Sequence, residues 1–133
     1  MLLDFIKISI SCALAFSVAA CASHGLPKIE RDSNKTARLV VEGKPFVVLG
    51  GELLNSSGST ASDMQKHWDG LADLNLNTVL LAVAWEQIEK NEGVFDFSEI
   101  EKIISQARER KMKLVLLWFG SWKNGFSGYV PHW

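Results

Sequence analysis

The chain has 133 residues, 47% of them hydrophobic, and its 14 lysines and arginines nearly balance 15 aspartates and glutamates. This length suits one ordinary domain, and the hydrophobic content excludes general disorder. Neither sign of charge forms a long run, so no basic surface is predicted for a phosphate backbone, and nucleic acid is not an expected partner.

An uncharged apolar run lies near the start, where residues 8–20 read ISISCALAFSVAA. The run is too short to cross a bilayer, which takes about 20 residues, and we interpret residues 1–20 as a signal peptide. Val18-Ala19-Ala20-Cys21 resembles a bacterial lipobox, in which the cysteine carries the lipid. Cys21 is therefore the expected lipidation site of an exported protein, periplasmic or at the cell surface and anchored to a bacterial membrane. The alternative is that Cys21 merely lies near an ordinary cleavage site.

A tether and a β-hairpin are predicted next. Residues 22–36 (ASHGLPKIERDSNKT) are polar and carry both signs of charge, so residues 21–36 are interpreted as the lipidated cysteine and a tether. Residues 37–51 (ARLVVEGKPFVVLGG) hold two β-rich runs on either side of the turn formers at 42–45. This pattern predicts a hairpin whose second strand covers residues 46–49, at the start of a domain over 37–133.

An amphipathic helix is predicted over residues 61–74. Met64 and Trp68 lie four positions apart there and begin an apolar stripe. Ser59 or Thr60 is expected to cap the first turn of this helix with its hydroxyl oxygen. Trp68 is interpreted as packing of the helix against the core.

Two buried strands and a second helix follow. Residues 77–84 (NTVLLAVA) form a short apolar run, typical of a strand that is covered on both faces in a parallel sheet. Ser98 and Glu101 fit a capping box at the start of the second helix, and residues 113–118 predict the next strand. The alternation of strands and helices indicates βαβ units and a parallel α/β sheet.

In parallel sheets the functional residues lie beyond the carboxyl ends of the strands. That rule selects residues 51–55, 85–89 and 120–129, which carry carboxylates, amides, a lysine and tryptophans. A pyranose presents hydroxyls to polar side chains and an apolar face to an indole, so this set is typical of a sugar site. The candidate substrate-binding residues are Glu52, Asn55, Trp85, Glu86, Trp122, Lys123 and Asn124.

Other kinds of site have weaker support. The sequence contains no glycine-rich phosphate loop, no C-x-x-C and no H-E-x-x-H motif, so neither a cofactor nor a metal is expected. For Trp85, filling space at the rim of the sheet is an equal alternative to binding sugar. Glu89 is interpreted as part of the turn before the second helix.

Three segments carry a resemblance to a known family. LGGELLNSS (49–57), NTVLLAVAWEQIEKNEGVFDFS (77–98) and LVLLWFGSWKNGFSGYVPHW (114–133) resemble, in order and spacing, the start of bacterial β-galactosidase-like enzymes of glycoside hydrolase families 35 and 42. The resemblance implies an α/β fold that is part of a (β/α)8 TIM barrel: the N-terminal hairpin, about the first three strands and two helices. It also implies terminal β-galactosides or related β-linked oligosaccharides or polysaccharides as substrates.

The resemblance places catalysis outside these residues. In those families two glutamates, after the fourth and seventh strands, act by a retaining mechanism, which needs the carboxyl groups about 5–5.5 Å apart. No catalytic residue is therefore expected in this chain, which is predicted to be the front of a longer enzyme and inactive alone. Two alternatives stay open: a surface lipoprotein that binds glycans without hydrolysing them, and a barrel glycosidase of other specificity, such as a β-glucosidase or β-mannanase.

Overall fold

The computed structural model describes residues 25–123 and 127–133. The chain divides into two compact units, Met1–Phe46 and Val47–Trp133, and each is described by itself. The expected signal peptide and the expected lipidation site at Cys21 lie outside the described residues. Within those residues, none of the helices combines the length and the apolar character that a membrane span needs.

The first unit holds a small antiparallel sheet of β1 (Lys28–Arg31), β2 (Ala37–Val41) and β3 (Lys44–Pro45), in that order. Glu42 and Gly43 connect β2 to β3, and both have positive φ, 53° and 76°. Positive φ at both central residues is the geometry of the turn that matches the twist of a two-residue hairpin. The predicted hairpin and its turn are thus confirmed.

Two expectations about this region were wrong. Residues 28–31, assigned to a tether, form β1, and Arg38 of β2 lies opposite Glu30 with its guanidinium 3.2 Å from that carboxylate. The sequence of this strand, KIER, is mostly charged and shows no run of apolar residues that would predict a strand. Its pairing with β2 stabilises it instead. The predicted second hairpin strand at residues 46–49 is absent, because β3 ends at Pro45 and the next strand pairs in the other unit.

The second unit is built on a parallel sheet of β4 (Gly50–Glu52), β5 (Thr78–Ala84) and β6 (Lys113–Phe119), with β5 in the middle. Thr78 pairs with Gly50 on one side and with Lys113 on the other, so the three strands start level. The predicted strands at 77–84 and 113–118 and their parallel direction are confirmed, whereas β4 lies just after the predicted strand at 46–49. The strands among the described residues form an open sheet and do not close into a barrel.

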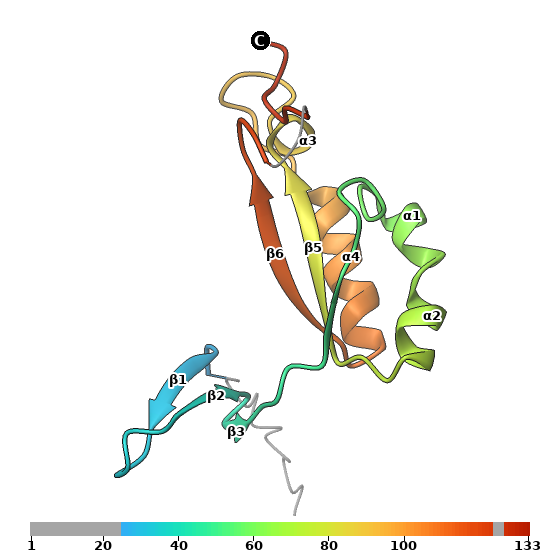
Figure 1. The fold of residues 1–133 in the computed structure, drawn as a ribbon. Coiled ribbons are helices and arrows are strands. Elements are labelled where there is room, and N and C mark those ends of the chain that lie inside the picture. The colour runs from blue at the N-terminus through green and yellow to red at the C-terminus, as the bar shows by residue number, and fades with distance from the viewer. Residues whose placement is uncertain (1–24, 124–126) are drawn as a thin grey trace, which may run out of the picture. The chain divides into compact units, whose positions relative to one another are not determined.

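Helices connect the strands of this sheet. The β4–β5 connection contains α1 (Ala61–Gln65) and α2 (Trp68–Asp73), and the β5–β6 connection contains α3 (Trp85–Ile88) and α4 (Ser98–Glu109). Figure 1 shows α4 alongside β5 and β6, with α1 and α2 farther out on the same side, while α3 lies beyond the strand tips. The result is a helical layer on one face of the sheet and loops at its carboxyl edge.

The first predicted helix is interrupted. α1 ends at the Lys66 cap and α2 starts after His67, where amides bond three residues back, His67 N to Met64 O at 2.9 Å. Such bonds tighten a helical turn and allow a change of direction. The expected cap at Thr60 is confirmed, because its hydroxyl accepts from the Asp63 amide at 3.1 Å.

The predicted capping box of the second helix was wrong. Ser98 is already helical, and its amide donates instead to the Asp96 carboxylate at 2.9 Å. That hydrogen bond holds the pKa of Asp96 below its ordinary value. The carboxylate of Glu99, which was not part of the predicted box, accepts the Ala61 amide of α1 at 2.9 Å. The helix is therefore capped from the preceding turn and linked to its neighbour.

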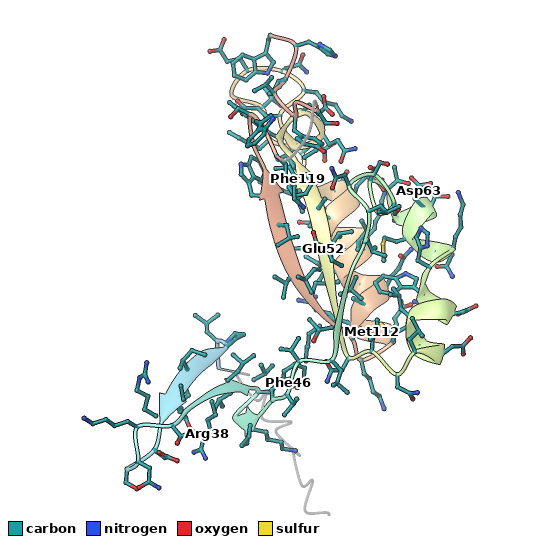
Figure 2. All side chains as sticks on the ribbon, in the orientation of Figure 1. Arg38, Phe46, Glu52, Asp63, Met112 and Phe119 are labelled. Carbon is teal, nitrogen blue, oxygen red and sulfur yellow. The ribbon has the colours of Figure 1, made fainter. Side chains whose placement is uncertain are left out.

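The main core fills the space between the sheet and the helices. Trp68 is fully buried, and its indole N–H donates to Gln106 of α4 at 2.8 Å. Gln106 in turn donates to the Ala61 carbonyl of α1 at 3.1 Å, so the polar groups in this core are satisfied. Met112, at the start of β6, marks the amino end of the sheet in Figure 2. The apolar core residues are Ala61, Met64, Trp68, Leu71, Val79, Leu81, Val83, Ile88, Ile100, Ile103, Ala107 and Met112.

The loop between β4 and α1 passes close to this core. A side chain at Gly58 would collide with Leu81 of β5 and would lie 2.9 Å from the Met64 sulfur. Leu81 and Met64 are both almost completely buried. Only glycine fits at this point of the loop.

A smaller cluster covers the opposite face of the sheet at its carboxyl edge. Ala82, Ala84 and Phe119 come from β5 and β6, and Tyr129 packs against them from the chain beyond β6. Figure 2 shows Phe119 at the strand end, far from Met112. This cluster places Tyr129, the last residue of the predicted segment 120–129, at the carboxyl edge of the sheet.

Candidate functional site at the carboxyl edge of the sheet

The structure brings two of the predicted site residues into direct contact. Lys123 follows β6 and its ammonium lies 3.0 Å from the Glu52 carboxylate at the end of β4. The same ammonium lies 4.2 Å from the centre of the Phe119 ring. Since β5 separates β4 from β6, this ion pair joins the two outer strands of the sheet.

The pair remains accessible to a ligand. The side chains of Lys123 and Glu52 are 30% and 51% exposed. An ion pair this exposed contributes less than about 1 kcal/mol to stability, because water screens it. Its chief effect is to hold an ammonium and a carboxylate side by side, one donating and one accepting hydrogen bonds.

Tyr129 links Asn55 to the helix that follows β5. The Asn55 amide nitrogen donates to the Tyr129 hydroxyl at 2.7 Å, and the Tyr129 carbonyl accepts the Glu86 amide N–H at 2.9 Å. The tyrosine ring packs on Phe119 with the ring centres 4.9 Å apart. We call Glu52, Asn55, Lys123 and Tyr129 the edge cluster.

Tyr129 ends the predicted functional segment 120–129 but was not among the candidate binding residues. It is the single tyrosine of the chain and stands in a glycine- and serine-containing segment, away from the apolar runs. Its hydroxyl accepts from Asn55, and among the residues that the structure describes none is seen to accept its own proton. A phenol is both donor and acceptor, so this proton is available to a ligand oxygen.

Trp85 has a structural role in the turn after β5. Its indole N–H donates to the Glu89 carboxylate at 2.6 Å, and that carboxylate also accepts the Gly93 amide at 2.8 Å. Trp133 meets Trp85 edge to face at 6.1 Å and donates to the Glu89 carbonyl at 3.0 Å. Glu89 is only 6% exposed, which confirms its assignment to the turn.

The remaining predicted residues are Glu86, Trp122 and Asn124. The Glu86 side chain borders a separate hollow beside α3. Trp122 is 69% exposed, next to Lys123 in sequence, and Asn124 lies outside the described residues. Of the seven predicted residues, three therefore belong to the edge cluster, Trp85 belongs to a structural turn and Glu86 borders a second hollow.

A metal centre has no support among residues 25–123 and 127–133, where no group of three or more histidine, cysteine or acidic side chains could hold an ion. The chemistry that the edge offers is hydrogen bonding by a carboxylate, an amide, an ammonium and a phenol. Such a mixture suits a neutral ligand with many hydroxyl groups.

Comparison with known proteins gives a likeness of fold. No family model matches the chain, and no curated protein matches it. Among solved structures, an exo-β-1,4-mannosidase from Opitutaceae bacterium strain TAV5 is similar, with a TM-score of 0.57 and 20% sequence identity. The match covers 79% of this chain and 19% of the mannosidase chain. The mixed α/β fold described here is thus similar to the fold of about a fifth of the mannosidase chain.

Proposed function

We propose that this chain forms part of the substrate end of a β-glycoside hydrolase and that its edge cluster binds a sugar of a β-linked oligosaccharide or polysaccharide. One observation carries the proposal: at the carboxyl edge of a parallel sheet, the segment with Glu52 and Asn55 is contacted by Lys123 and Tyr129, more than 70 residues later in the chain. Enzymes built on such sheets have their active sites at that edge.

The exposed side chains of β6 agree with a partial (β/α)8 barrel. Val115, Leu116 and Trp118 are 42%, 45% and 56% exposed, and apolar residues of that kind suit a strand that continues into a larger sheet. The two catalytic glutamates implied by the resemblance would follow later strands of such a barrel. The 133-residue chain is then a binding unit without hydrolytic activity of its own.

The preferred sugar is a matter for experiment. The resemblance in sequence favours β-galactosides, whereas the similar solved structure acts on β-1,4-mannosides, as its name states. Calorimetric titration of the chain with methyl β-galactoside, methyl β-mannoside and methyl β-glucoside compares these sugars directly. We expect saturable binding of at least one, with the β-galactoside tightest.

Matched variants test whether the edge cluster is the site. Glu52→Gln removes a charged acceptor, and we expect affinity to fall about tenfold or more, since hydrogen bonds to charged groups contribute about 1.5–3 kcal/mol. Gln65→Ala is the control, because Gln65 is exposed on α1 and forms no described hydrogen bond. Equal affinity of the unaltered chain and Glu52→Gln would refute the assignment.

Hydrolysis is assayed with nitrophenyl β-glycosides. We expect no turnover by the 133-residue chain, and turnover by the product of the complete gene. Turnover by the chain itself would show that the catalytic carboxylates lie within it. Sugar binding without turnover by the complete product would favour a glycan-binding protein over an enzyme.

We also propose that Cys21 carries a lipid that anchors the protein to a bacterial membrane. The proposal rests on the lipobox-like residues Val18-Ala19-Ala20-Cys21. Metabolic labelling with a fatty acid should mark the protein in the membrane fraction, and Cys21→Ser should abolish the label. A labelled Cys21→Ser variant would contradict the proposal.

A further inference from the structure

Lys123 neutralises the carboxylate of the edge cluster. Its ammonium lies 3.0 Å from the carboxylate of Glu52, and the two formal charges cancel. The other members, Asn55 and Tyr129, contribute an amide and a phenol that are joined by a 2.7 Å hydrogen bond. The edge cluster therefore has no net formal charge, although it contains a half-exposed carboxylate.

Phe119 contacts the ammonium of Lys123 from a second side. The ammonium lies 4.2 Å from the centre of the ring, within the roughly 6 Å over which a cation is attracted to an aromatic face. The ring itself is buried and packs on Tyr129 with the ring centres 4.9 Å apart, so it presents a fixed surface. A lysine side chain is flexible, and contacts on two sides restrict this one to a position beside Glu52.

The position of the ammonium determines which ligands the carboxylate can bind. An ammonium has three N–H donors; Glu52 accepts from one of them, and a hydroxyl oxygen of a ligand is a suitable acceptor for another. A positively charged ligand would instead be repelled by Lys123 and would find Glu52 already paired. Without Lys123, the half-exposed carboxylate of Glu52 would attract a ligand ammonium, because charge-assisted hydrogen bonds are about twice as strong as neutral ones.

We propose that Lys123 restricts the edge cluster to neutral sugars by neutralising Glu52, and that the Phe119 ring holds Lys123 in the position that this requires. Lys123 is then a specificity-determining residue that excludes amino sugars, and Phe119 is a positioning residue that acts through Lys123. The inference rests on the proposed function and narrows its substrate class to sugars without a cationic group.

The test compares neutral sugars with amino sugars by calorimetric titration. The neutral probe is whichever of methyl β-galactoside, methyl β-mannoside and methyl β-glucoside binds the unaltered chain most tightly. The charged probes are its 2-amino-2-deoxy and 6-amino-6-deoxy derivatives with the amine protonated, in which a group of similar size replaces one hydroxyl. We expect at least one of them to bind the unaltered chain about tenfold more weakly than the neutral probe, because its charge is repelled by Lys123.

Removing the charge of Lys123 should reverse this preference. In Lys123→Gln and Lys123→Met the carboxylate of Glu52 is no longer paired, so we expect the same amino sugar to bind about threefold more tightly than the neutral probe, or better. Two variants guard against a folding defect in one of them. Lys66→Gln is the matched control, because Lys66 forms a 3.3 Å ion pair with Asp63 of α1, and it should keep the preference of the unaltered chain.

The role of Phe119 is tested by the ratio of the two affinities. Phe119→Leu removes the aromatic face, and we expect the preference for the neutral probe to shrink from about tenfold to about threefold or less. Phe119→Tyr keeps an aromatic face and should retain the full preference. A general loosening of the site would lower both affinities together and leave their ratio unchanged.

Each outcome decides a different part of the inference. An unaltered chain that binds the amino sugars as tightly as the neutral probe would overturn the role of Lys123 and leave the proposed function in place. A preference for the neutral probe that persists in both Lys123 variants would overturn that role as well. An unchanged ratio in Phe119→Leu would overturn the positioning role of Phe119. Absence of binding by every sugar would overturn the proposed function together with this inference.

Discussion

Replacing Tyr129 by phenylalanine tests whether one hydroxyl holds the edge cluster together. The substitution removes the 2.7 Å hydrogen bond from Asn55 and keeps the ring that packs on Phe119 at 4.9 Å. The backbone carbonyl that accepts from Glu86 is also unchanged. The variant therefore isolates the phenol oxygen from the packing of the segment.

The magnitude follows from the kind of bond that is lost. A neutral hydrogen bond contributes about 0.5–1.5 kcal/mol to folding, so we expect Tyr129→Phe to lower the free energy of unfolding by about 1 kcal/mol. Tyr129→Ala removes a buried aromatic ring and should lower it by about 3 kcal/mol or more. The difference between the two variants measures the contribution of the ring.

The assay is urea unfolding followed by circular dichroism, on Tyr129→Phe, Asn55→Ala and the double variant. If the hydroxyl and the amide interact as the structure has them, the double variant should be more stable than the sum of the single effects predicts, by about 0.5 kcal/mol or more. Sugar affinity should fall in both single variants. Additive effects within about 0.3 kcal/mol, with sugar affinity unchanged, would refute the role given to Tyr129.

Three further predictions concern the ion pair, the first helix cap and acid stability. A double-mutant cycle on Glu52 and Lys123 should give a coupling of about 0.2–1 kcal/mol that shrinks at 1 M salt; a coupling that does not depend on salt would contradict an exposed pair. Thr60→Ala should lower the free energy of unfolding by about 1 kcal/mol, whereas Ser62→Ala, at an exposed position on the same helix, should leave it nearly unchanged; equal losses in the two would show that Thr60 is not the cap. The pKa of Glu99 is held below 4.5 by hydrogen bonds from Lys102 and from the Ala61 amide of α1, and by the charge of Lys102. The ionised carboxylate therefore contributes to the free energy of unfolding above that pH, and this contribution is lost as the pH falls through the folded-state pKa. Glu99→Gln should therefore have a lower free energy of unfolding than the unaltered chain near neutral pH and nearly the same free energy of unfolding at acid pH. The same loss at both pH values would contradict a stabilising role of the ionised carboxylate.

The parallel sheet could be predicted because its strands have a strong local signal. The apolar run of β5 is buried along nearly its whole length, and the spacing from β5 to β6 leaves room for one helix, which is the pattern of a βαβ unit. α4 buries Ile100, Ile103 and Ala107, which recur at intervals of three and four residues, the period of one helix face. Where side chains repeat with a clear period, the fold follows from the sequence.

The errors fall where partners distant in sequence decide the structure. β1 is charged and becomes a strand only because β2 lies beside it, and Glu99 of α4 accepts the Ala61 amide of α1, 38 residues earlier in the chain. Tyr129 joins the site through Asn55, which is 74 residues earlier in the chain. A single sequence contains no signal for contacts of this kind, whereas the ends of parallel strands follow a general rule, which is why Glu52 and Lys123 could be expected at the same edge of the sheet.

The glycine at position 58 lets two core residues set the position of the loop that carries Asn55. This loop rests on Leu81 and Met64 with no side chain between them, so its height above the sheet is set by the shape of those two residues. A change of size at either residue would move the loop and, with it, the Asn55 amide of the edge cluster. Under the proposed function, affinity for a sugar would then change with substitutions at positions that the sugar does not touch.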